Sequence, residues 1–252
     1  MCLILVAWRG NPKYPLVVAA NRDEFHARLA EPAHWWQDEP QILAGRDLSA
    51  GGTWLGVTAH GRFAALTNFR GAPRRDAAPS RGALVADILR SADPVSGVLD
   101  HLRRVGPNYN AFNVIFSDGE RLAVYESTTG MGRELAPGIY GLSNHLLDTP
   151  WPKVRNAKSA LSKALAELPD SRAALALLRD DRPAPDELLP RTGLTQDWER
   201  LMSSAFIRAD DYGTRCSTII SIDALGGARF EEWTWNPAGL EQSIARFEFP
   251  IA

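Results

Sequence analysis

The chain has 252 residues, of which 45% are hydrophobic, so it can bury the core of a folded globular protein. Its 28 basic and 30 acidic residues nearly cancel, and a formal charge of −2 does not favour nucleic acid or an anionic membrane as a partner. The early apolar run over residues 3–8 is far shorter than a membrane span, and no basic segment precedes it. We therefore expect a cytoplasmic protein without stable membrane insertion, whose partner is a small molecule.

The first half of the chain predicts strands followed by helices. Residues 2–8 and 16–20 are apolar runs separated by turn residues, which predicts a hairpin, and residues 54–58 and 62–67 predict a second one. Between residues 81 and 105 the apolar side chains recur at helical spacing, with a break at Asp93-Pro94. We expect a helical pair to cover the early strands.

The second half repeats this order and closes with strands. Strand-like composition returns over residues 111–116, 121–126 and 139–142. Helical spacing follows over residues 154–168 and 173–178. Three strand-like segments end the chain, over residues 215–222, 229–235 and 244–249. The order lacks a strict alternation of strand and helix, so we predict an α+β fold of two antiparallel sheets flanked by helices, in a single domain spanning residues 1–252.

Cys2 is the most informative residue for function. Removal of Met1, expected before a residue this small, would leave a thiol and a free α-amine on one residue. The amine has an ordinary pKa of about 7.7–8.0 and the thiol one of about 8.5, so the amine can accept the thiol proton near neutrality. The alternative is a small buried side chain at the start of a strand.

The tetrapeptide Asn21-Arg22-Asp23-Glu24 ends the second apolar run, and the predicted hairpin brings it beside the N-terminus. In an extended chain Asn21 and Asp23 share one face, while Arg22 and Glu24 take the other. Asp23 could then hold the α-ammonium, and Arg22 could pair with Glu24. The alternative is an exposed strand end rich in charge.

Two asparagines and one arginine have a similar position at strand ends. Asn68 and Asn144 each follow an apolar strand, where an amide can donate to a developing oxyanion or simply start a turn. Alternation in the segment around Arg215 places Cys216 on the opposite face. We therefore expect Cys2 to titrate below an ordinary thiol and Cys216 to be inert.

No metal site is expected, because the five histidines and two cysteines lack ligand spacing. Two cysteines also cannot build a disulfide framework. We expect no required cofactor.

Several short motifs together strongly resemble the family named for its Asn-Arg-Asp-Glu motif, the transport and Golgi organisation protein 2 family. They are Met1-Cys2, Asn21-Arg22-Asp23-Glu24, Gly51-Gly52-Thr53-Trp54-Leu55-Gly56, Thr67-Asn68-Phe69-Arg70, Ser143-Asn144 and Gly213-Thr214-Arg215. That family is in turn similar to the N-terminal-nucleophile hydrolases of the cholylglycine hydrolase and penicillin V acylase group. The resemblance implies a four-layer αββα sandwich.

The resemblance also implies roles for single residues. It implies Cys2 as nucleophile, Asp23 as partner of its amine, Asn68 and Asn144 as oxyanion donors, and Arg215 as a charge near the thiolate. We place Asn21, Arg22, Trp54 and Arg70 in the substrate-binding set. The hydrolase pattern runs Arg-Asn-x-Asp, whereas Ala20 stands at the arginine position here, so Arg22 or Arg215 would have to supply the missing cation.

Two functions remain open at this point. The first is an enzyme in which the cysteine attacks the carbonyl of a small acylated amide or thioester and transfers the acyl group to water or an amine. The second, which the resemblance implies, is a non-catalytic protein that binds and carries haem, a lipid or an acyl-coenzyme A in the same cleft, with Cys2 or a histidine as a contact.

Overall fold

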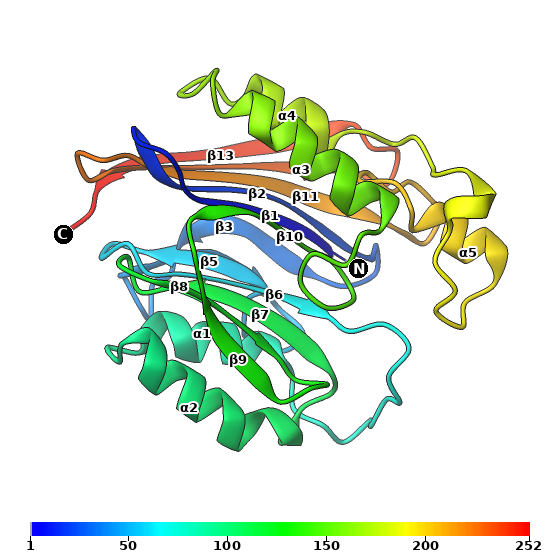
Figure 1. Cartoon of the computed structure of the whole chain (residues 1–252), viewed down its shortest axis with the longest axis horizontal. Helices are drawn as coiled ribbons and strands as arrows, with labels where there is room; N and C mark the ends of the chain where they lie inside the picture. The colour runs from blue at the N-terminus through cyan, green and yellow to red at the C-terminus, as the bar shows by residue number, and fades with distance from the viewer. Residues whose placement is uncertain (1) are drawn as a thin grey trace.

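The computed structural model describes residues 2–252, in which two antiparallel β-sheets pack against each other (Figure 1). The first sheet has six strands, in the order β10 (Gly138–Leu142), β1 (Cys2–Asn11), β2 (Tyr14–Phe25), β11 (Tyr212–Ile222), β12 (Gly227–Trp235) and β13 (Glu241–Pro250). The second has seven, in the order β3 (Ala30–Trp35), β4 (Ile42–Asp47), β5 (Leu55–Thr58), β6 (Phe63–Asn68), β7 (Phe112–Ser117), β8 (Leu122–Glu126) and β9 (Met131–Leu135).

Helices cover the outer face of each sheet. They are α1 (Gly82–Arg90) and α2 (Val95–Val105) on the second sheet, and α3 (Pro152–Ala164) and α4 (Arg172–Leu178) on the first (Figure 1). A short helix, α5 (Gln196–Leu201), lies at one end of the molecule. The layers are therefore α, β, β and α, and the predicted sandwich is confirmed.

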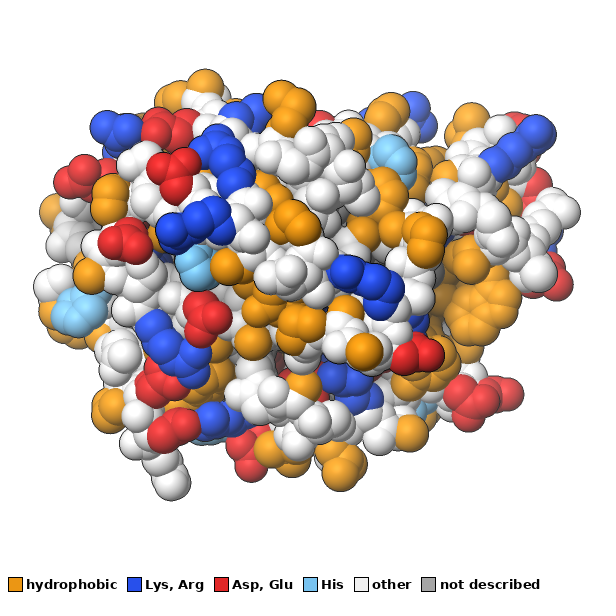
Figure 2. All heavy atoms as spheres, turned by 90° about the horizontal axis from the view of Figure 1, so that it is seen from below, with side chains coloured by type: hydrophobic (Ala, Val, Ile, Leu, Met, Phe, Trp, Pro, Cys, Tyr) orange, Lys and Arg blue, Asp and Glu red, His pale blue; other side chains and the backbone are white. Residues whose placement is uncertain are grey.

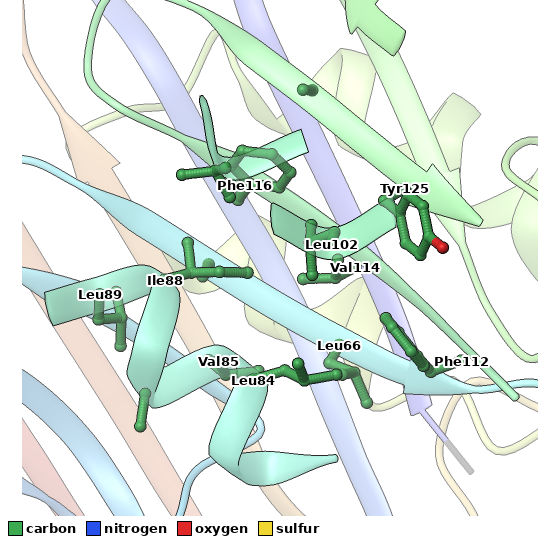
Figure 3. Packing of buried hydrophobic residues seen from close by; sticks show 14 of the residues in the cluster. Leu66, Leu84, Val85, Ile88, Leu89, Leu102, Phe112, Val114, Phe116 and Tyr125 are labelled. Atoms are coloured by element: carbon green, nitrogen blue, oxygen red, sulfur yellow. The ribbon is translucent and has the colours of Figure 1, made fainter. Parts of the chain in front are cut away.

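Three apolar clusters account for these layers. One lies between the two sheets, one between the first sheet and α3 and α4, and one between the second sheet and α1 and α2. In the last, Leu84, Val85 and Ile88 of α1 point toward side chains of β6 and β7 such as Leu66 and Val114 (Figure 3). Both faces of each sheet are covered by other layers. The sequences of β1 and β2 therefore contain continuous apolar runs and do not alternate apolar with polar residues.

The second strand is longer than its apolar run predicts. β2 continues through Asn21, Arg22, Asp23 and Glu24 to Phe25, so the tetrapeptide lies within the sheet and does not end the strand. Asn21 and Arg22 are paired on both sides, by β1 and by β11, and Asp23 and Glu24 are paired by β11. Central pairing satisfies the backbone groups of a polar segment that would otherwise have to face water.

Three strands and one helix were not predicted from the sequence, namely β3, β4, β9 and α5. β3 and β9 are the two edge strands of the second sheet, half of whose residues or more are exposed, and β3 contains Pro32. β4 pairs with β3 and β5 and was also missed. α5 has only six residues. Edge strands and one-turn helices bury little apolar surface, so their hydrophobic patterns are weak.

The surface carries charges of both signs in mixture. On the face shown in Figure 2, basic and acidic side chains are interspersed with hydrophobic ones, with no broad field of one sign, in keeping with the small net charge. Within residues 2–252, each helix is too short or too polar to cross a membrane.

A close approach between two glycines fixes α1 against the entry to β5. The Thr53 backbone N–H donates to the Gly82 carbonyl oxygen at 3.2 Å. A Cβ added to Gly52 would lie 2.4 Å from the carbonyl carbon of Gly82, closer than any real contact. The contact matters for the site because Thr53 and Gly82 both line the cavity described below.

We predict that Gly52→Ala lowers the free energy of unfolding by about 1–3 kcal/mol, as overpacking does. The matched control is Gly10→Ala, where an added Cβ meets no described atom within 4 Å and the change should stay within about 0.5 kcal/mol. Thermal unfolding followed by circular dichroism measures both. Equal melting temperatures for the two variants would contradict the close approach.

Candidate functional site

A cavity of about 1000 Å³ opens between the ends of the two sheets, the segment over residues 74–82 and α5. The first sheet contributes Cys2, Arg22, Asp23, Glu24, Phe25, Tyr212, Arg215, Cys216, Glu232 and Thr234 to its wall. The opposite wall includes Arg46, Trp54, Leu66, Asn68 and Arg81, and α5 contributes Trp198. Of the residues predicted from the sequence, Cys2, Asp23, Asn68, Arg215, Arg22 and Trp54 line this cavity, whereas Asn21, Arg70 and Asn144 do not.

A row of four side chains crosses the first sheet at the cavity. Cys2 pairs with Arg22, Arg22 pairs with Cys216, and Cys216 pairs with Thr234. Directly opposed residues in antiparallel strands project from the same face, so the row faces the cavity together. Adjacent strands lie about 4.8 Å apart, which separates the two cysteines by roughly 10 Å, beyond disulfide reach. Arg22 therefore stands between two free thiols.

Cys2 is partly exposed at the start of β1. Burial raises the pKa of its thiol and the Asp23 carboxylate raises it further, while a hydrogen bond from the Asp23 backbone and the charge of Arg22 lower it. The direction is opposite to the expectation that Cys2 titrates below an ordinary thiol, because desolvation outweighs the cations around it. The carbonyl of Cys2 accepts a hydrogen bond from Ser143 Oγ at 2.9 Å, which ties the strand start to the segment after β10.

Asp23 is buried beside Cys2. Its Oδ1 accepts a hydrogen bond from Thr214 Oγ1 at 2.7 Å, and its carbonyl accepts one from the Tyr212 hydroxyl at 3.0 Å. Burial raises the pKa of this carboxyl, while Lys153, the Thr214 hydroxyl and Arg22 lower it. Asp23 is thus a carboxylate fixed by hydrogen bonds, at the position predicted for the partner of the N-terminal amine. Met1 lies outside the described residues.

Arg22 is a buried guanidinium whose positive charge is only weakly balanced by a neighbouring carboxylate. It is 9% exposed, and Glu24 Oε2 lies 4.0 Å from its Nη2. Within residues 2–252, no acceptor takes a hydrogen bond from its side chain, so its N–H donors are available to a molecule in the cavity. The predicted pairing with Glu24 is present only as this long contact.

The two asparagines take different positions. Asn68 ends β6 as an exposed residue of the cavity wall. Asn144 is fully buried, and its Nδ2 donates to the Asn68 carbonyl at 2.8 Å. The prediction that Asn144 faces the reacting carbonyl is therefore wrong for this structure, because its amide holds the end of β6. Its role is to fix the backbone that carries Asn68.

Asn21 faces the helical layer and not the cavity. Its Nδ2 donates to the carbonyls of Leu178 and Ala205 at 2.7 and 2.8 Å, and its Oδ1 accepts from Ser217 Oγ at 2.6 Å. The predicted alternation explains this placement, since Asn21 and Arg22 must lie on opposite faces of β2. The prediction of Asn21 as a substrate contact is wrong, and the residue instead fastens α4 to the sheet.

Arg70 is also turned away from the cavity. Its Nη1 lies 2.7 Å from Glu199 Oε2 of α5 in a buried ion pair, and its guanidinium lies 4.8 Å from the ring centroid of Trp151. The prediction of Arg70 as a substrate contact is therefore wrong, because Glu199 and Trp151 occupy its charge. Trp54, by contrast, lines the cavity as predicted.

Arg215 lines the cavity together with Cys216, which contradicts the predicted opposite faces. A β-bulge between Thr214 and Cys216 makes Arg215 an extra residue in β11, and the alternation is lost there. Its Nη1 donates to the carbonyls of Phe25, His26 and Arg28 at 3.0–3.2 Å, so it holds the end of β2. Burial and the neighbouring Glu232 raise the pKa of Cys216 well above its usual range.

Three functional candidates were missed in the sequence. Arg81, just before α1, is within electrostatic reach of Cys2 and Glu24. Glu232 is a buried carboxyl whose pKa is raised by burial, and its Oε1 accepts from the Ala33 backbone at 2.7 Å. Lys153 is a buried lysine in the first turn of α3. Charged residues within apolar strands or at the unfavourable end of a helix are the signals that could have found them.

No cluster of three or more histidine, cysteine or carboxylate side chains that could hold a metal occurs in the described part of the chain. No histidine lines the cavity among residues 2–252. The groups that line it include thiols, guanidiniums, carboxylates, an asparagine amide and aromatic rings.

Two solved structures show a partial likeness to this chain. A Caenorhabditis elegans orthologue of N-acylethanolamine-hydrolyzing acid amidase has a TM-score of 0.45 and 10% identity, over 87% of this chain and 92% of that one. A mutant conjugated bile acid hydrolase from Clostridium perfringens has a TM-score of 0.45 and 12% identity, over 100% of this chain and 98% of that one.

Sequence relatives are much more similar. The transport and Golgi organization protein 2 homolog of Bos taurus is 36% identical over 92% of each chain, and that of Homo sapiens is 34% identical over 92% of each. Transport and Golgi organization protein 2 of Drosophila melanogaster is 29% identical over 97% of this chain and 99% of that one. The model of the family described as Transport and Golgi organisation 2 matches residues 1–237. The chain therefore belongs to the Transport and Golgi organisation 2 family.

Proposed function

We propose that this protein is a cysteine-dependent hydrolase or acyltransferase that acts on the amide or thioester of a small anionic acyl compound. The observation that carries the proposal is the placement of Cys2 at the start of β1, in a cavity of about 1000 Å³ and beside the buried guanidinium of Arg22. A thiol next to unused N–H donors can attack a carbonyl whose oxygen those donors stabilise.

The reaction begins with a chain from which Met1 has been removed. Cys2 Sγ forms a bond to the carbonyl carbon while its proton passes to the α-amine, and Asn68 and Arg22 hold the oxyanion. The C–N or C–S bond then breaks, and the leaving amine or thiol takes the proton from the α-ammonium. Water attacks the acyl-cysteine by the same route, releases the carboxylic acid and restores the thiol.

The charges around the cavity support an anionic substrate. Arg22 is within electrostatic reach of Arg215, and Arg81 is within reach of Cys2. Among residues 2–252, Arg81 and Arg215 donate only to backbone carbonyls, and Glu24 is the carboxylate that acts on both. The whole lining carries seven arginines and six carboxylates, so the positive excess is confined to the group formed by Arg22, Arg81 and Arg215, where it suits a carboxylate or phosphate.

Apolar side chains support an acyl group in the same ligand. Trp54 and Leu66 lie on one wall, and Trp198 and Tyr212 lie at the other with ring centroids 6.1 Å apart. Trp198 is 40% exposed, which is high for a tryptophan that has no ligand against it. One cavity thus combines an apolar part, a cationic part and a thiol.

A carrier of haem, a lipid or an acyl-coenzyme A is the second candidate function, because the same cavity has the volume and the arginines for a large anionic ligand. Of the two thiols in the wall, Cys2 is the more exposed and could contact haem iron, whereas no histidine reaches the wall formed by residues 2–252. The two functions differ in whether the thiol reacts.

We predict that Cys2→Ser abolishes turnover of acyl substrates, because the hydroxyl cannot replace the thiol as nucleophile. Asn68→Ala should lower the rate by roughly 10²–10³-fold, as loss of an oxyanion donor does. The matched control is Cys216→Ser, which should retain activity. A panel of N-acyl amino acids, penicillin V and acyl-coenzyme A, assayed beside haem titration, provides the measurement. Stoichiometric haem binding that survives Cys2→Ser, without turnover of any substrate, would replace the enzyme with the carrier.

We predict that the mature protein lacks Met1 and that iodoacetamide labels Cys2 faster than Cys216. The first follows from the need for a free α-amine, and the second from the burial of Cys216 beside Glu232, which holds its pKa far above the usual range. Intact-mass spectrometry and peptide mapping measure them. Full retention of Met1, or faster labelling of Cys216, would remove Cys2 as a self-activated nucleophile.

We predict that Arg22→Gln weakens binding of N-lauroylglycine by roughly 10-fold or more, as loss of a charged hydrogen bond does, and leaves binding of the neutral dodecanamide nearly unchanged. Arg46→Gln is the matched control, because Arg46 also lines the cavity but is held by Asp38 at 2.6 Å. Protection of Cys2 against iodoacetamide gives the affinities. Equal losses for both ligands would argue against an anion contact at Arg22.

A further inference from the structure

Lys153 is buried in a place that disfavours a cation. It is the second residue of α3 and is 5% exposed. The first turn of a helix carries the positive end of the helix dipole, so an ammonium there is repelled and not stabilised. Within residues 2–252, its Nζ has no hydrogen-bond partner, although it is fully enclosed. A lysine retained in such a position is expected to serve a neighbour.

The charged groups facing Lys153 come from three other elements. They are Cys2 of β1, Asp23 of β2 and Arg70 just after β6. Arg70 is already paired with Glu199 of α5, so Asp23 is the carboxylate through which Lys153 connects to the site. Burial lowers the pKa of Lys153 to about 8, and Asp23 and Cys2 act against that change. The lysine is therefore largely charged at neutral pH and loses its charge just above it.

Backbone contacts hold this arrangement in place. The start of β1 lies beside the segment that leads into α3 (Figure 1), and Ser143 of that segment donates to the Cys2 carbonyl at 2.9 Å. Asp23 is fixed by Thr214 at 2.7 Å. Lys153 thus approaches the nucleophile from the helical layer, whereas Arg22 and Arg81 approach it from the cavity.

We propose that Lys153 is a positioning residue of the Cys2 site, whose ammonium keeps Asp23 ionised and stabilises the Cys2 thiolate from the side opposite the substrate. The proposal rests on Cys2 as the nucleophile of the proposed function. The hydrolase pattern has an arginine where this chain has Ala20 on β2. The proposal places the corresponding cation on α3 instead.

The test is the pH dependence of Cys2 alkylation by iodoacetamide, measured by peptide mapping on the whole chain. Lys153→Met should slow labelling at pH 7 by roughly 10-fold, because the wild-type lysine is charged there, and should match the wild-type rate well above pH 8, where that lysine is neutral. Lys153→Arg should restore most of the rate. Lys158→Met is the matched control on the same helix, because Lys158 pairs with Asp148 at 2.7 Å and should leave the profile unchanged. The other groups around Cys2, namely Arg22, Asp23, Arg81, Cys216 and Glu232, stay the same in every variant.

Thermal unfolding separates this role from a structural one. Lys153→Met leaves the buried Asp23 with less compensating charge, so its melting temperature should fall, and labelling is compared at a temperature where both proteins are folded. A stable variant with an unmoved Cys2 profile would overturn the proposal while leaving the nucleophile intact. A wild-type Cys2 that does not react with iodoacetamide at any pH would refute the proposed nucleophile, and this role with it.

A second measurement leaves Lys153 unchanged and so does not depend on the folding of its variants. The chain has four lysines, and NMR of labelled lysine side chains can follow each ammonium. Electrostatic coupling is reciprocal, so Asp23→Asn should shift the Lys153 titration midpoint below its wild-type value, because Asp23 raises the pKa of Lys153. An identical midpoint in both proteins would show that the two groups do not interact.

Discussion

The pairing of β1 with β2 up to the first described residue is the constraint on which the site depends. Because Cys2 is opposed to Arg22 and Arg22 to Cys216, one backbone ladder fixes which side chains share a face. The same ladder sends Asn21 toward the helices, where it binds the end of α4. A chain terminus is usually poorly ordered, and here pairing with a central strand fixes it. Cys2, the proposed nucleophile, is thus positioned by the inner strands of a sheet.

Desolvation dominates the electrostatics around this row. Burial raises the pKa of Cys2, Asp23 and Glu232 alike, although guanidiniums stand beside each of them. The ionisation of the Cys2 thiol is therefore coupled to Arg22, a guanidinium that also lines the cavity.

Most of the fold could be predicted from the sequence, because the strands and helices that bury apolar surface on both faces leave long hydrophobic runs, as in residues 3–8. Cys2 and Asp23 line the cavity as predicted, because the pairing of neighbouring strands decides where they lie. The placement of other residues could not be predicted, because partners distant in the sequence decide it. Arg70 is claimed by Glu199, Asn144 by the backbone of Asn68, and no local pattern records either contact. The motif residues of this family are thus divided between the cavity wall and the scaffold that supports it.

The bulge at Arg215 has a further consequence for how the wall is built. Thr214 pairs with Asp23, and Cys216 pairs with the adjacent residue Arg22. The strand pairing on both sides of Arg215 is therefore the same as it would be if Arg215 were absent. The residue is an insertion that adds one side chain to the cavity without displacing its neighbours. A shorter β11 would keep Cys216 beside Arg22 and Ser217 against Asn21. Loss of Arg215 would therefore keep the thiol row in register but would remove the three hydrogen bonds that hold the end of β2.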